Sequence, residues 1–521
     1  MTQFSNPLFP SPADWRDLTF YQIFTDRFAD GDTSNNESTP GARYEPAKPH
    51  GIHGGDFQGI EQHLDYIQGL GAKAIWITPV FLNESNSAWH GYGAINFDLI
   101  SPQLGGLKAL RDLIQSSHRR GIYVLIDVVA NHTGDVITSD DPGWPSYRPT
   151  GEGYHLRWRD PKTIPPPPFN NLNWYHNRGR IENWNDPTQS VIGQFFTLSD
   201  LRTELPEVRA ALLQVYQKLI RETNCDGFRV DTVRHVERSF WGPWCTAIRA
   251  YATSLGKTNF LLFGEVADRQ DEKLAIFTVP EMKGEKVFDS LLDFPFYYAI
   301  KEVVGLAEAP TRQLTQRWQH LAAPPYSRDS LTQLVTFIDN HDQPRFMAKE
   351  SADGDPQRLR QALVLLYTSI GIPCLYYGTE QGFQGGHDPF NREDMIGIGS
   401  DPKAVNHFDP KHPLYEFIAR LIQVRDKQPA LRKGSLKVVL DNRAGPGLFA
   451  FVRQLGKDYA LIILNTADEV RTIKLARTPL PSHAVLRSAL DPVQPMRLGG
   501  SGGLAATKIP PKAAWILVKS P

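Results

Sequence analysis

The chain has 521 residues, which is long for one domain, and 41% of them are hydrophobic. Its 56 Lys and Arg residues nearly balance 57 Asp and Glu residues, so the formal charge is −1. This balance excludes the basic surface typical of proteins that bind nucleic acid or anionic membranes, and no apolar run reaches the roughly 18–20 residues of a membrane span. We expect no nucleic-acid or membrane partner, and either a monomer or a small homo-oligomer.

The N-terminal segment bears on where the protein resides. Its first fifteen residues, MTQFSNPLFPSPADW, contain neither the basic nor the apolar stretch of a signal peptide. We expect a cytoplasmic location, or a secreted one if a signal peptide has been removed. The three cysteines, Cys225, Cys245 and Cys374, are too few and too scattered for a disulfide framework or a four-ligand zinc site, so we expect buried free thiols.

Short β-branched or aromatic runs alternate with helical periodicity along most of the chain. Strands too apolar to face water, alternating with helices, predict a parallel sheet closed into an α/β (β/α)₈ TIM barrel. An open doubly wound sheet is the alternative that periodicity leaves open. The predicted strands are FYQIF (20–24), AIWIT (74–78), YVLID (123–127), GFRVD (227–231), FLLFG (260–264), FDSLL (288–292), LVTFI (334–338) and PCLYY (373–377).

Two stretches depart from this alternation. Between about 133 and 207 the helical periodicity is weak and Pro, Asn, Trp and Gly are frequent. Because a structureless loop of that length is uncommon inside a domain, we expect a small irregular subdomain after the third strand. After about 430, short alternating strands predict a C-terminal antiparallel β-sandwich. The predicted domains are the barrel (1–132 and 208–430), the inserted subdomain (133–207) and the C-terminal β domain (431–521).

Acids and histidines follow several predicted strands directly. The third strand leads into Asp127, Asn131 and His132, the fourth carries Arg229 and Asp231, the fifth precedes Glu265, and the seventh leads into Asp339, Asn340, His341 and Asp342. In a parallel barrel these strand ends meet at one face, where catalysis takes place. We therefore expect the side chains to form one site.

Two carboxylates on adjacent strands suit glycoside hydrolysis with retention of configuration, in which one acts as nucleophile and the other as acid and then base. Arg229, two residues before Asp231, points to the same side of its strand and supplies the positive charge that keeps a nucleophile ionised. Glu265 follows an apolar run, and burial there would help it to hold a proton. The sequence lacks the HExxH, GxSxG and Walker patterns of other hydrolytic chemistries.

These residues stand in motifs that resemble the four signature regions of the α-amylase family of glycoside hydrolases: DVVANH, GFRVDTVRH, GEV and FIDNHD. The resemblance extends from YQIFTDRF to YYGTEQ. It implies that Asp231 is the nucleophile, Glu265 the acid/base and Asp342 the third carboxylate, which stabilises the transition state. It also implies that other side chains hold the sugar: His132, Arg229 and His341 at the cleaved position, Tyr92 by stacking with His90 nearby, and Asp388 and Arg392 further from the break.

The resemblance implies Ca²⁺ at two places. The family's calcium site corresponds to Asn131, Asp200 and the backbone carbonyl of His235, all of them oxygen donors suited to a hard cation. A second group resembles the extra calcium site of cyclodextrin glucanotransferases. Its expected donors are Asp30, Asp32, Asn35, Asn36, the Gly54 carbonyl and Asp56.

The motifs leave the reaction divided between hydrolysis and transfer. Phe196, four residues before Asp200, resembles the central aromatic residue of cyclodextrin glucanotransferases, but Ala267 stands where those enzymes carry a second aromatic residue. Those enzymes also have further C-terminal domains, and cyclomaltodextrinases have an extra N-terminal one; we expect neither in this protein. We expect hydrolysis of α-1,4-glucans and maltooligosaccharides with some transglycosylation. The alternatives are a cyclodextrin-degrading or glucan-transferring enzyme, and a non-catalytic glucan-binding protein, which would lack a carboxylate or the arginine.

Overall fold

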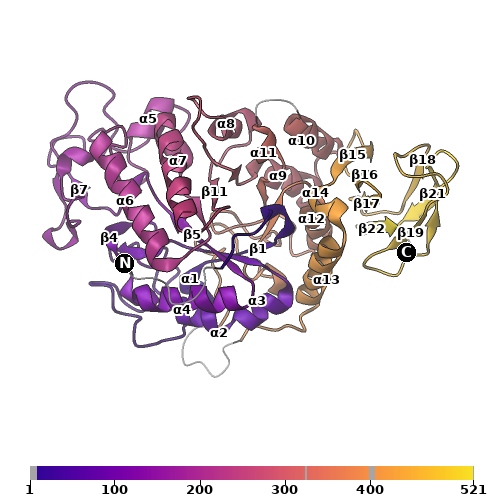
Figure 1. Ribbon diagram of the computed structural model, residues 1–521, viewed down its shortest axis with the longest axis horizontal. Coiled ribbons are helices and arrows are strands. Elements are labelled where there is room, and N and C mark those ends of the chain that lie inside the picture. The colour runs from indigo at the N-terminus through magenta and orange to yellow at the C-terminus, as the bar shows by residue number, and fades with distance from the viewer. Residues whose placement is uncertain (1–8, 323–325, 398–404, 520–521) are drawn as a thin grey trace.

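Eight parallel strands form the centre of the fold (Figure 1). The computed structural model describes residues 9–322, 326–397 and 405–519. The strands lie in the order β12-β11-β10-β5-β2-β1-β14-β13, and a parallel bridge between Leu292 and Val335 joins the two outer strands. The sheet therefore closes into a (β/α)₈ barrel, which confirms the predicted architecture over an open sheet. The strands are β1 (Phe20–Ile23), β2 (Ala74–Ile77), β5 (Tyr123–Val128), β10 (Gly227–Val230), β11 (Leu261–Gly264), β12 (Ser290–Leu291), β13 (Val335–Thr336) and β14 (Ile372–Tyr376).

Alternate residues of the barrel strands point to opposite sides of the wall. Phe20, Trp76 and Phe263 belong to one buried cluster that fills the barrel interior. Their neighbours Tyr21 and Ile75 belong to a larger buried cluster between the wall and the helices. Both sides of each strand are therefore apolar, which explains the continuous hydrophobic runs in the sequence.

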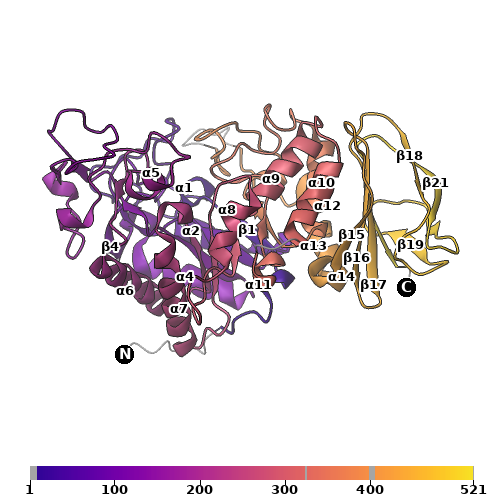
Figure 2. The same ribbon diagram turned by 90° about the horizontal axis from the view of Figure 1, so that it is seen from above.

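Helices cover the outside of the barrel (Figures 1 and 2). Several begin with an aspartate whose side chain accepts a hydrogen bond from the first turn, as Asp56 does from Gly59 N at 2.7 Å and Asp355 from Gln357 N at 2.8 Å. The helices are α1 (Thr25–Phe28), α2 (Phe57–Gln62), α3 (Leu64–Leu70), α4 (Gly106–Arg119), α5 (Pro187–Ile192), α6 (Pro206–Thr223), α7 (Arg238–Ser254), α8 (Asp271–Ala275), α9 (Phe294–Ile300), α10 (Arg312–Ala322), α11 (Arg328–Leu331), α12 (Pro356–Thr368), α13 (Pro413–Lys427) and α14 (Pro429–Lys433).

The segment after β5 is mostly irregular, in line with its weak periodicity. It contains the paired strands β7 (Ile137–Thr138) and β8 (Arg157–Trp158) and the short helix α5. The strands β6 (His132–Thr133) and β9 (Ser199–Asp200) pair antiparallel and join its two ends. Because β6 crosses the predicted boundary at 132/133, and α14 crosses the one at 430/431, the domain limits themselves stay predictions. A hairpin that the sequence analysis missed, β3 (Phe81–Asn83) and β4 (Ala94–Ile100), lies before α4.

The C-terminal strands form two antiparallel sheets at one end of the long axis, with the irregular segment at the other (Figures 1 and 2). Strands from both sheets contribute to one buried cluster, as Ile463 and Ile473 do. Trp318 of α10 stacks on Phe449, with ring centroids 5.5 Å apart, and fixes this part to the barrel helices. The strands are β15 (Ser435–Leu440), β16 (Leu448–Leu455), β17 (Asp458–Asn465), β22 (Ala514–Lys519), β19 (Val485–Ser488) and β20 (Met496–Arg497) in one sheet, and β18 (Arg471–Leu475) and β21 (Leu504–Ile509) in the other.

Two sequence predictions concern single features of the chain. All three cysteines are buried and free, as expected. Within the described ranges, no helix is long and apolar enough to cross a membrane. The first eight residues, on which the predicted location partly depends, lie outside the described residues.

Candidate active site

A cleft of about 780 Å³ opens at the carboxyl ends of the barrel strands. Asp231 follows β10, Glu265 follows β11, and Asp342 comes six residues after β13. The cleft has both polar and aromatic walls, which suits a sugar chain. Ten of the residues predicted to act on or hold the sugar line it: His90, Tyr92, His132, Phe196, Asp231, Glu265, His341, Asp342, Asp388 and Arg392.

Arg229, which is completely buried, lies beneath the cleft and holds three carboxylates. Its Nη1 is 2.8 Å from Asp231 Oδ1 and 2.9 Å from both oxygens of Asp127, and its Nη2 is 3.0 Å from Glu265 Oε2. Trp76 Nε1 also donates to Asp127, at 3.1 Å. Because one guanidinium group contacts both Asp231 and Glu265, the two carboxylates are held close together at the floor of the cleft.

Burial raises the pKa of each of these carboxyl groups. Burial raises the pKa of Glu265 to about 8, with Arg229 opposing the shift and the charges of Asp231 and Asp342 adding to it. Burial also raises the pKa of Asp231 above its ordinary value, again against Arg229. Burial raises the pKa of Asp127 to about 7. Burial therefore favours the protonated form of Glu265, whereas Asp231 has the shortest contact to the Arg229 cation.

Thr232, directly after Asp231, takes a left-handed backbone conformation, with φ 48°. A β-branched residue rarely adopts this conformation because its side chain crowds the backbone. The backbone N–H of Thr232 donates to Glu265 Oε2 at 3.2 Å. The sharp turn after β10 thus supplies a second contact that fixes the Glu265 carboxylate.

A chain of hydrogen bonds connects the side chains predicted to hold the sugar. The Tyr92 hydroxyl donates to Asp127 Oδ2 at 2.8 Å and lies 2.8 Å from His341 Nε2. Gln22 Nε2 lies 2.7 Å from His341 Nδ1. A neutral His341 with its proton on Nε2 satisfies every one of these contacts, and burial holds the pKa of His341 well below its ordinary value.

Other polar residues predicted to hold the sugar are also fixed by hydrogen bonds or ion pairs. Arg392 Nη2 is 3.3 Å from Asp342 Oδ1, and its Nη1 is 3.1 Å from Asp388 Oδ1. His132 Nε2 donates to the Tyr92 carbonyl at 3.1 Å, and burial lowers the pKa of His132 to about 4. His90 Nδ1 accepts from Tyr92 N at 3.0 Å. The cleft thus presents to a ligand neutral histidines, and carboxylates whose positions are fixed by Arg392.

One wall of the cleft is aromatic. The Phe196 side chain is 63% exposed, and its backbone is left-handed, with φ 56°. Trp184, which the sequence analysis missed, lies beside Phe196 with ring centroids 5.3 Å apart. Arg234 Nη2 donates to the Trp184 carbonyl at 3.1 Å and so steadies this wall next to Ala267, which also lines the cleft. The frequency of tryptophan and asparagine in the segment is the only sequence signal that could have pointed to Trp184.

Two of the three predicted donors of the family's calcium site meet at the β6–β9 pair. Leu201 N donates to the Asn131 carbonyl at 2.8 Å, which places Asn131 beside Asp200. Asp200 Oδ1 is buried and has no hydrogen-bond partner among the described residues. Burial raises the pKa of Asp200 to about 7, although His176 opposes this. His235 ends the 3₁₀-helix Val233–His235, and its Nδ1 lies 2.7 Å from the Ser190 carbonyl.

The predicted donors of the second calcium site fall into two groups: some have oxygens without a hydrogen-bond partner among the described residues, and others are bound elsewhere. Asp30 Oδ1, Asn35 Oδ1 and Asn36 Oδ1 are buried without a hydrogen-bond partner among the described residues. A Cβ at Gly54 would lie 2.8 Å from Asn36 Oδ1, so only glycine leaves this space open. Asp30 and Asn36 thus meet beside Gly54 in an oxygen-lined cradle that fits a hard cation, and Asn35 directly precedes Asn36 in the chain.

Asp32 and Asp56 have other partners. Asp32 Oδ1 accepts from Ser34 N at 3.0 Å. The Asp56 carboxylate caps α2 through Gly59 and also accepts from Gly31 N at 3.1 Å and Asn35 Nδ2 at 2.7 Å. Asp56 therefore shapes the cradle around the other donors, and the Asp32 carboxylate points to its own turn.

Comparison with known proteins identifies the family. The family model "Alpha amylase, catalytic domain" matches residues 22–408. A beta/alpha-amylase of Paenibacillus polymyxa is 34% identical over 88% of this chain and 34% of its own length, and an alpha-amylase of Streptomyces lividans is 31% identical over 82% and 52%. The chain thus spans about a third to a half of these two relatives. Others, at 30% and 28% identity, are named cyclomaltodextrinase (Bacillus sp) and maltogenic alpha-amylase (Bacillus acidopullulyticus).

Solved structures extend the similarity to the whole fold. The alpha-amylase of Geobacillus thermoleovorans, solved with acarbose, is 30% identical with a TM-score of 0.78, covering 98% of this chain and 100% of its own. A cyclomaltodextrin glucanotransferase with a three-domain distribution is 26% identical with a TM-score of 0.77, covering 96% and 99%. A transferase of this size overturns the argument from domain content, so further domains do not distinguish the two activities. By the match of its sequence and fold, the chain belongs to the α-amylase family of glycoside hydrolases and is an enzyme.

Proposed function

We propose that the enzyme hydrolyses α-1,4-glucosidic bonds of starch-type glucans and maltooligosaccharides with retention of configuration, and with some transglycosylation. The observation that carries this proposal is the contact of one guanidinium group, that of Arg229, with both Asp231 and Glu265. Retaining glycosidases hold their two carboxyl groups roughly 5–5.5 Å apart, whereas inverting ones need a wider gap for a water molecule. Two carboxylates bound to one guanidinium group fit the narrower arrangement.

In the first step, Asp231 attacks the anomeric carbon while Glu265 gives its proton to the departing glycosidic oxygen. The bond to the leaving sugar breaks, and a glycosyl ester forms on Asp231. In the second step, Glu265 removes a proton from a water molecule, whose oxygen displaces Asp231. Asp342 stabilises the positive charge that develops on the sugar in both steps. The raised pKa of Glu265 supports the acid role, since the group must be protonated before the first step.

The configuration of the first product tests the double displacement. Hydrolysis of a maltooligosaccharide followed by proton NMR should release the α-anomer first, with the β-anomer appearing later by mutarotation. An initial β-anomer would contradict two successive displacements at one carbon.

Calcium fits this chain at two places. Asn131 and Asp200, with the carbonyl of His235, would hold one ion, and the unpartnered oxygen of Asp200 supports that assignment. Asp30, Asn35, Asn36 and the Gly54 carbonyl would hold the other. When bound, the ions supply positive charge to these buried oxygens. Asn131 and Asp200 themselves join the two ends of the irregular segment beside the cleft.

Transfer of the glycosyl group to a second sugar is the alternative. The observation that favours it is the exposed ring of Phe196 beside Trp184, because stacked acceptors compete better with water. Ala267 reduces this surface, so we favour hydrolysis as the main reaction. A non-catalytic role fits poorly, since Arg229 and all three carboxylates are present.

A further inference from the structure

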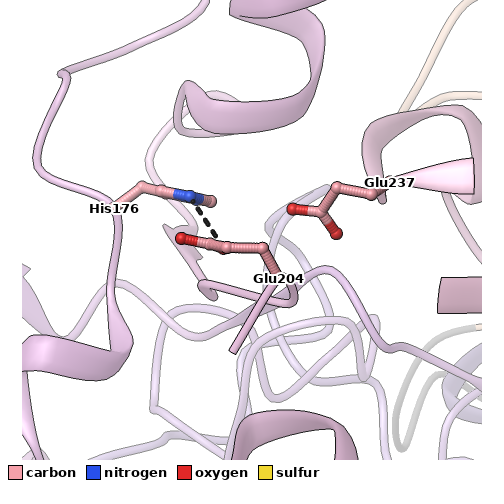
Figure 3. Close-up of side chains that lie close together, drawn as sticks. All are labelled: His176, Glu204 and Glu237. Atoms are coloured by element: carbon pink, nitrogen blue, oxygen red, sulfur yellow. Dashed lines mark ion pairs between the residues drawn. The ribbon is translucent and has the colours of Figure 1, made fainter. Parts of the chain in front are cut away.

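Three side chains outside the cleft converge at the base of the irregular segment: His176, Glu204 and Glu237 (Figure 3). Each offers one possible ligand atom, and these atoms all lie within 4.8 Å of one another. His176 belongs to the irregular segment, Glu204 lies two residues before the start of α6, and Glu237 directly precedes α7. The cluster therefore joins three separate stretches of chain.

His176 is oriented as a metal-binding histidine. Its Nδ1 lies 2.6 Å from Asp200 Oδ2, so Nδ1–H donates to that carboxylate. This leaves the Nε2 lone pair facing the cluster from a ring that is only 9% exposed. Histidines that ligate metal ions almost always donate their other ring N–H to a carboxylate or carbonyl, which fixes the tautomer and raises the basicity of the ligating nitrogen. Asp200 has this role here.

One of the three distances between ligand atoms equals that of a tetrahedral site, and the other two are no longer than 4.8 Å. His176 Nε2 and Glu204 Oε2 are 3.3 Å apart. In a tetrahedral site with bonds of about 2.0–2.1 Å, neighbouring ligand atoms lie roughly 3.3–3.4 Å apart. Arg202 Nε holds the other oxygen of Glu204 at 2.9 Å, and the Thr203 hydroxyl donates to Glu237 Oε2. Both carboxylates are thus anchored through one oxygen.

We propose that His176, Glu204 and Glu237 bind a divalent transition-metal cation such as Zn²⁺. One imidazole nitrogen and two carboxylate oxygens suit such an ion, whereas Ca²⁺ prefers oxygen ligands alone. A cavity of about 660 Å³ lined by His176 and Glu204 gives the ion a path from solvent and leaves room for a water molecule as fourth ligand. The inference does not depend on the proposed reaction.

The bound ion would tie the irregular segment to the beginnings of α6 and α7. That segment carries Trp184 and Phe196 of the cleft wall. Asp200 would serve two metal sites at once, with Oδ2 on His176 and Oδ1 free for calcium. The alternative explanation of the same distances needs no metal ion: a protonated His176 would donate to both Asp200 and Glu204.

Zinc titration separates the two accounts. The 521-residue chain is stripped of metal ions with a chelator, returned to excess Ca²⁺, and titrated with Zn²⁺ by calorimetry. We expect one Zn²⁺ per chain, and an affinity at least about tenfold weaker in each of Glu204→Gln and Glu237→Gln. Glu207→Gln, an exposed carboxylate in the first turn of α6 outside the cluster, is the matched control and should bind as the wild type does.

A spectroscopic measurement accompanies the titration. Co²⁺ in place of Zn²⁺ should give the intense visible absorption of four-coordinate cobalt in the wild type and in Glu207→Gln, and lose it in Glu237→Gln. Melting curves in Ca²⁺ alone establish that the variants fold. If the wild type takes up no Zn²⁺, or if both cluster variants bind it as tightly as the wild type, the site is refuted and the ion bridge through protonated His176 is the better account.

Discussion

The backbone N–H of Thr232 donates to Glu265 Oε2 at 3.2 Å from a left-handed conformation that Thr rarely adopts. Strain of this kind is worth about 1–3 kcal/mol and persists where surrounding structure enforces it, often at active sites. Here it allows one turn to carry Asp231 and at the same time to orient Glu265.

The cost of this turn can be measured by comparing two substitutions at Thr232. Both Thr232→Ala and Thr232→Gly remove the side chain, but only glycine adopts positive φ freely. We expect the glycine variant to be more stable than the alanine variant by about 1 kcal/mol in denaturant unfolding. Equal stabilities would mean that the turn is not strained.

Substitution of the two central carboxylates should separate their roles. Asp231→Asn cannot form the glycosyl ester, so we expect a loss of turnover on the order of 10⁴-fold with sugar binding retained. Glu265→Gln should lose about 10²–10⁴-fold on starch but keep much of its rate on an activated aryl glycoside, whose leaving group departs without a proton. Steady-state kinetics and calorimetric binding of a maltooligosaccharide check both expectations. More than a few per cent of starch activity in either variant would refute its role.

The pH profile should follow the proton on Glu265. Because the acid must be protonated in the free enzyme, kcat/KM on starch should fall as pH rises through about 8, the pKa of Glu265. On the acid side activity should fall as Asp231 becomes protonated, at a pH above the ordinary pKa of aspartate, since burial raises the pKa of Asp231. With an activated aryl glycoside, Glu265→Gln should show no alkaline limb. An alkaline limb that persists in Glu265→Gln would show that it arises from a group other than Glu265.

Removal of calcium should lower the stability of the folded state. An ion that binds only the folded protein at about 100 times its Kd contributes about 2.7 kcal/mol. Chelation should therefore lower the Tm, and readdition of Ca²⁺ alone should restore it. Asp200→Asn and Asp30→Asn should each reduce the Ca²⁺-dependent part of the shift, whereas Asp32→Asn should change it little because the Asp32 carboxylate faces Ser34. A Tm that changes with neither chelator nor Ca²⁺ would refute both proposed calcium sites.

The aromatic wall should decide how the glycosyl ester partitions. Phe196→Ala removes stacking worth about 1 kcal/mol, so the ratio of transfer to hydrolysis should fall about fivefold while hydrolysis of short substrates changes less. Ala267→Phe, which adds the missing ring, should raise the ratio. Product analysis with a labelled acceptor measures both. Dominant cyclic products from the wild type, or a ratio that neither substitution alters, would contradict the hydrolase proposal.

The barrel could be predicted because its strands are short apolar runs separated by helices, and every predicted strand overlaps an observed one. The hairpin β3–β4 was missed because β3 has only three residues and because the buried residues of β4, namely Ala94, Phe97 and Ile100, are three positions apart rather than two. The length of β13 was also overestimated, since the strand has two residues where five were predicted.

The candidate site was predictable only where residues stand in a compact motif. Asp231 and Glu265 follow recognisable strands, but the contact of Asp127 with Arg229 depends on the lateral pairing of β5 with β10. His176, Glu204 and Glu237 come from three segments without a fixed spacing, so no pattern in the sequence marks them. The left-handed backbone of Phe196 and Thr232 results from tertiary packing, which local propensity does not report.

The shared guanidinium group of Arg229 has a further consequence for the reaction cycle. While Asp231 is ionised, its charge helps to raise the pKa of Glu265, and the two compete for one cation. In the proposed double displacement, esterification of Asp231 cancels that charge and leaves Arg229 to Glu265 and Asp127. In that step the proton affinity of Glu265 falls when it changes from proton donor to proton acceptor, so the covalent state of one carboxylate sets the acidity of the other.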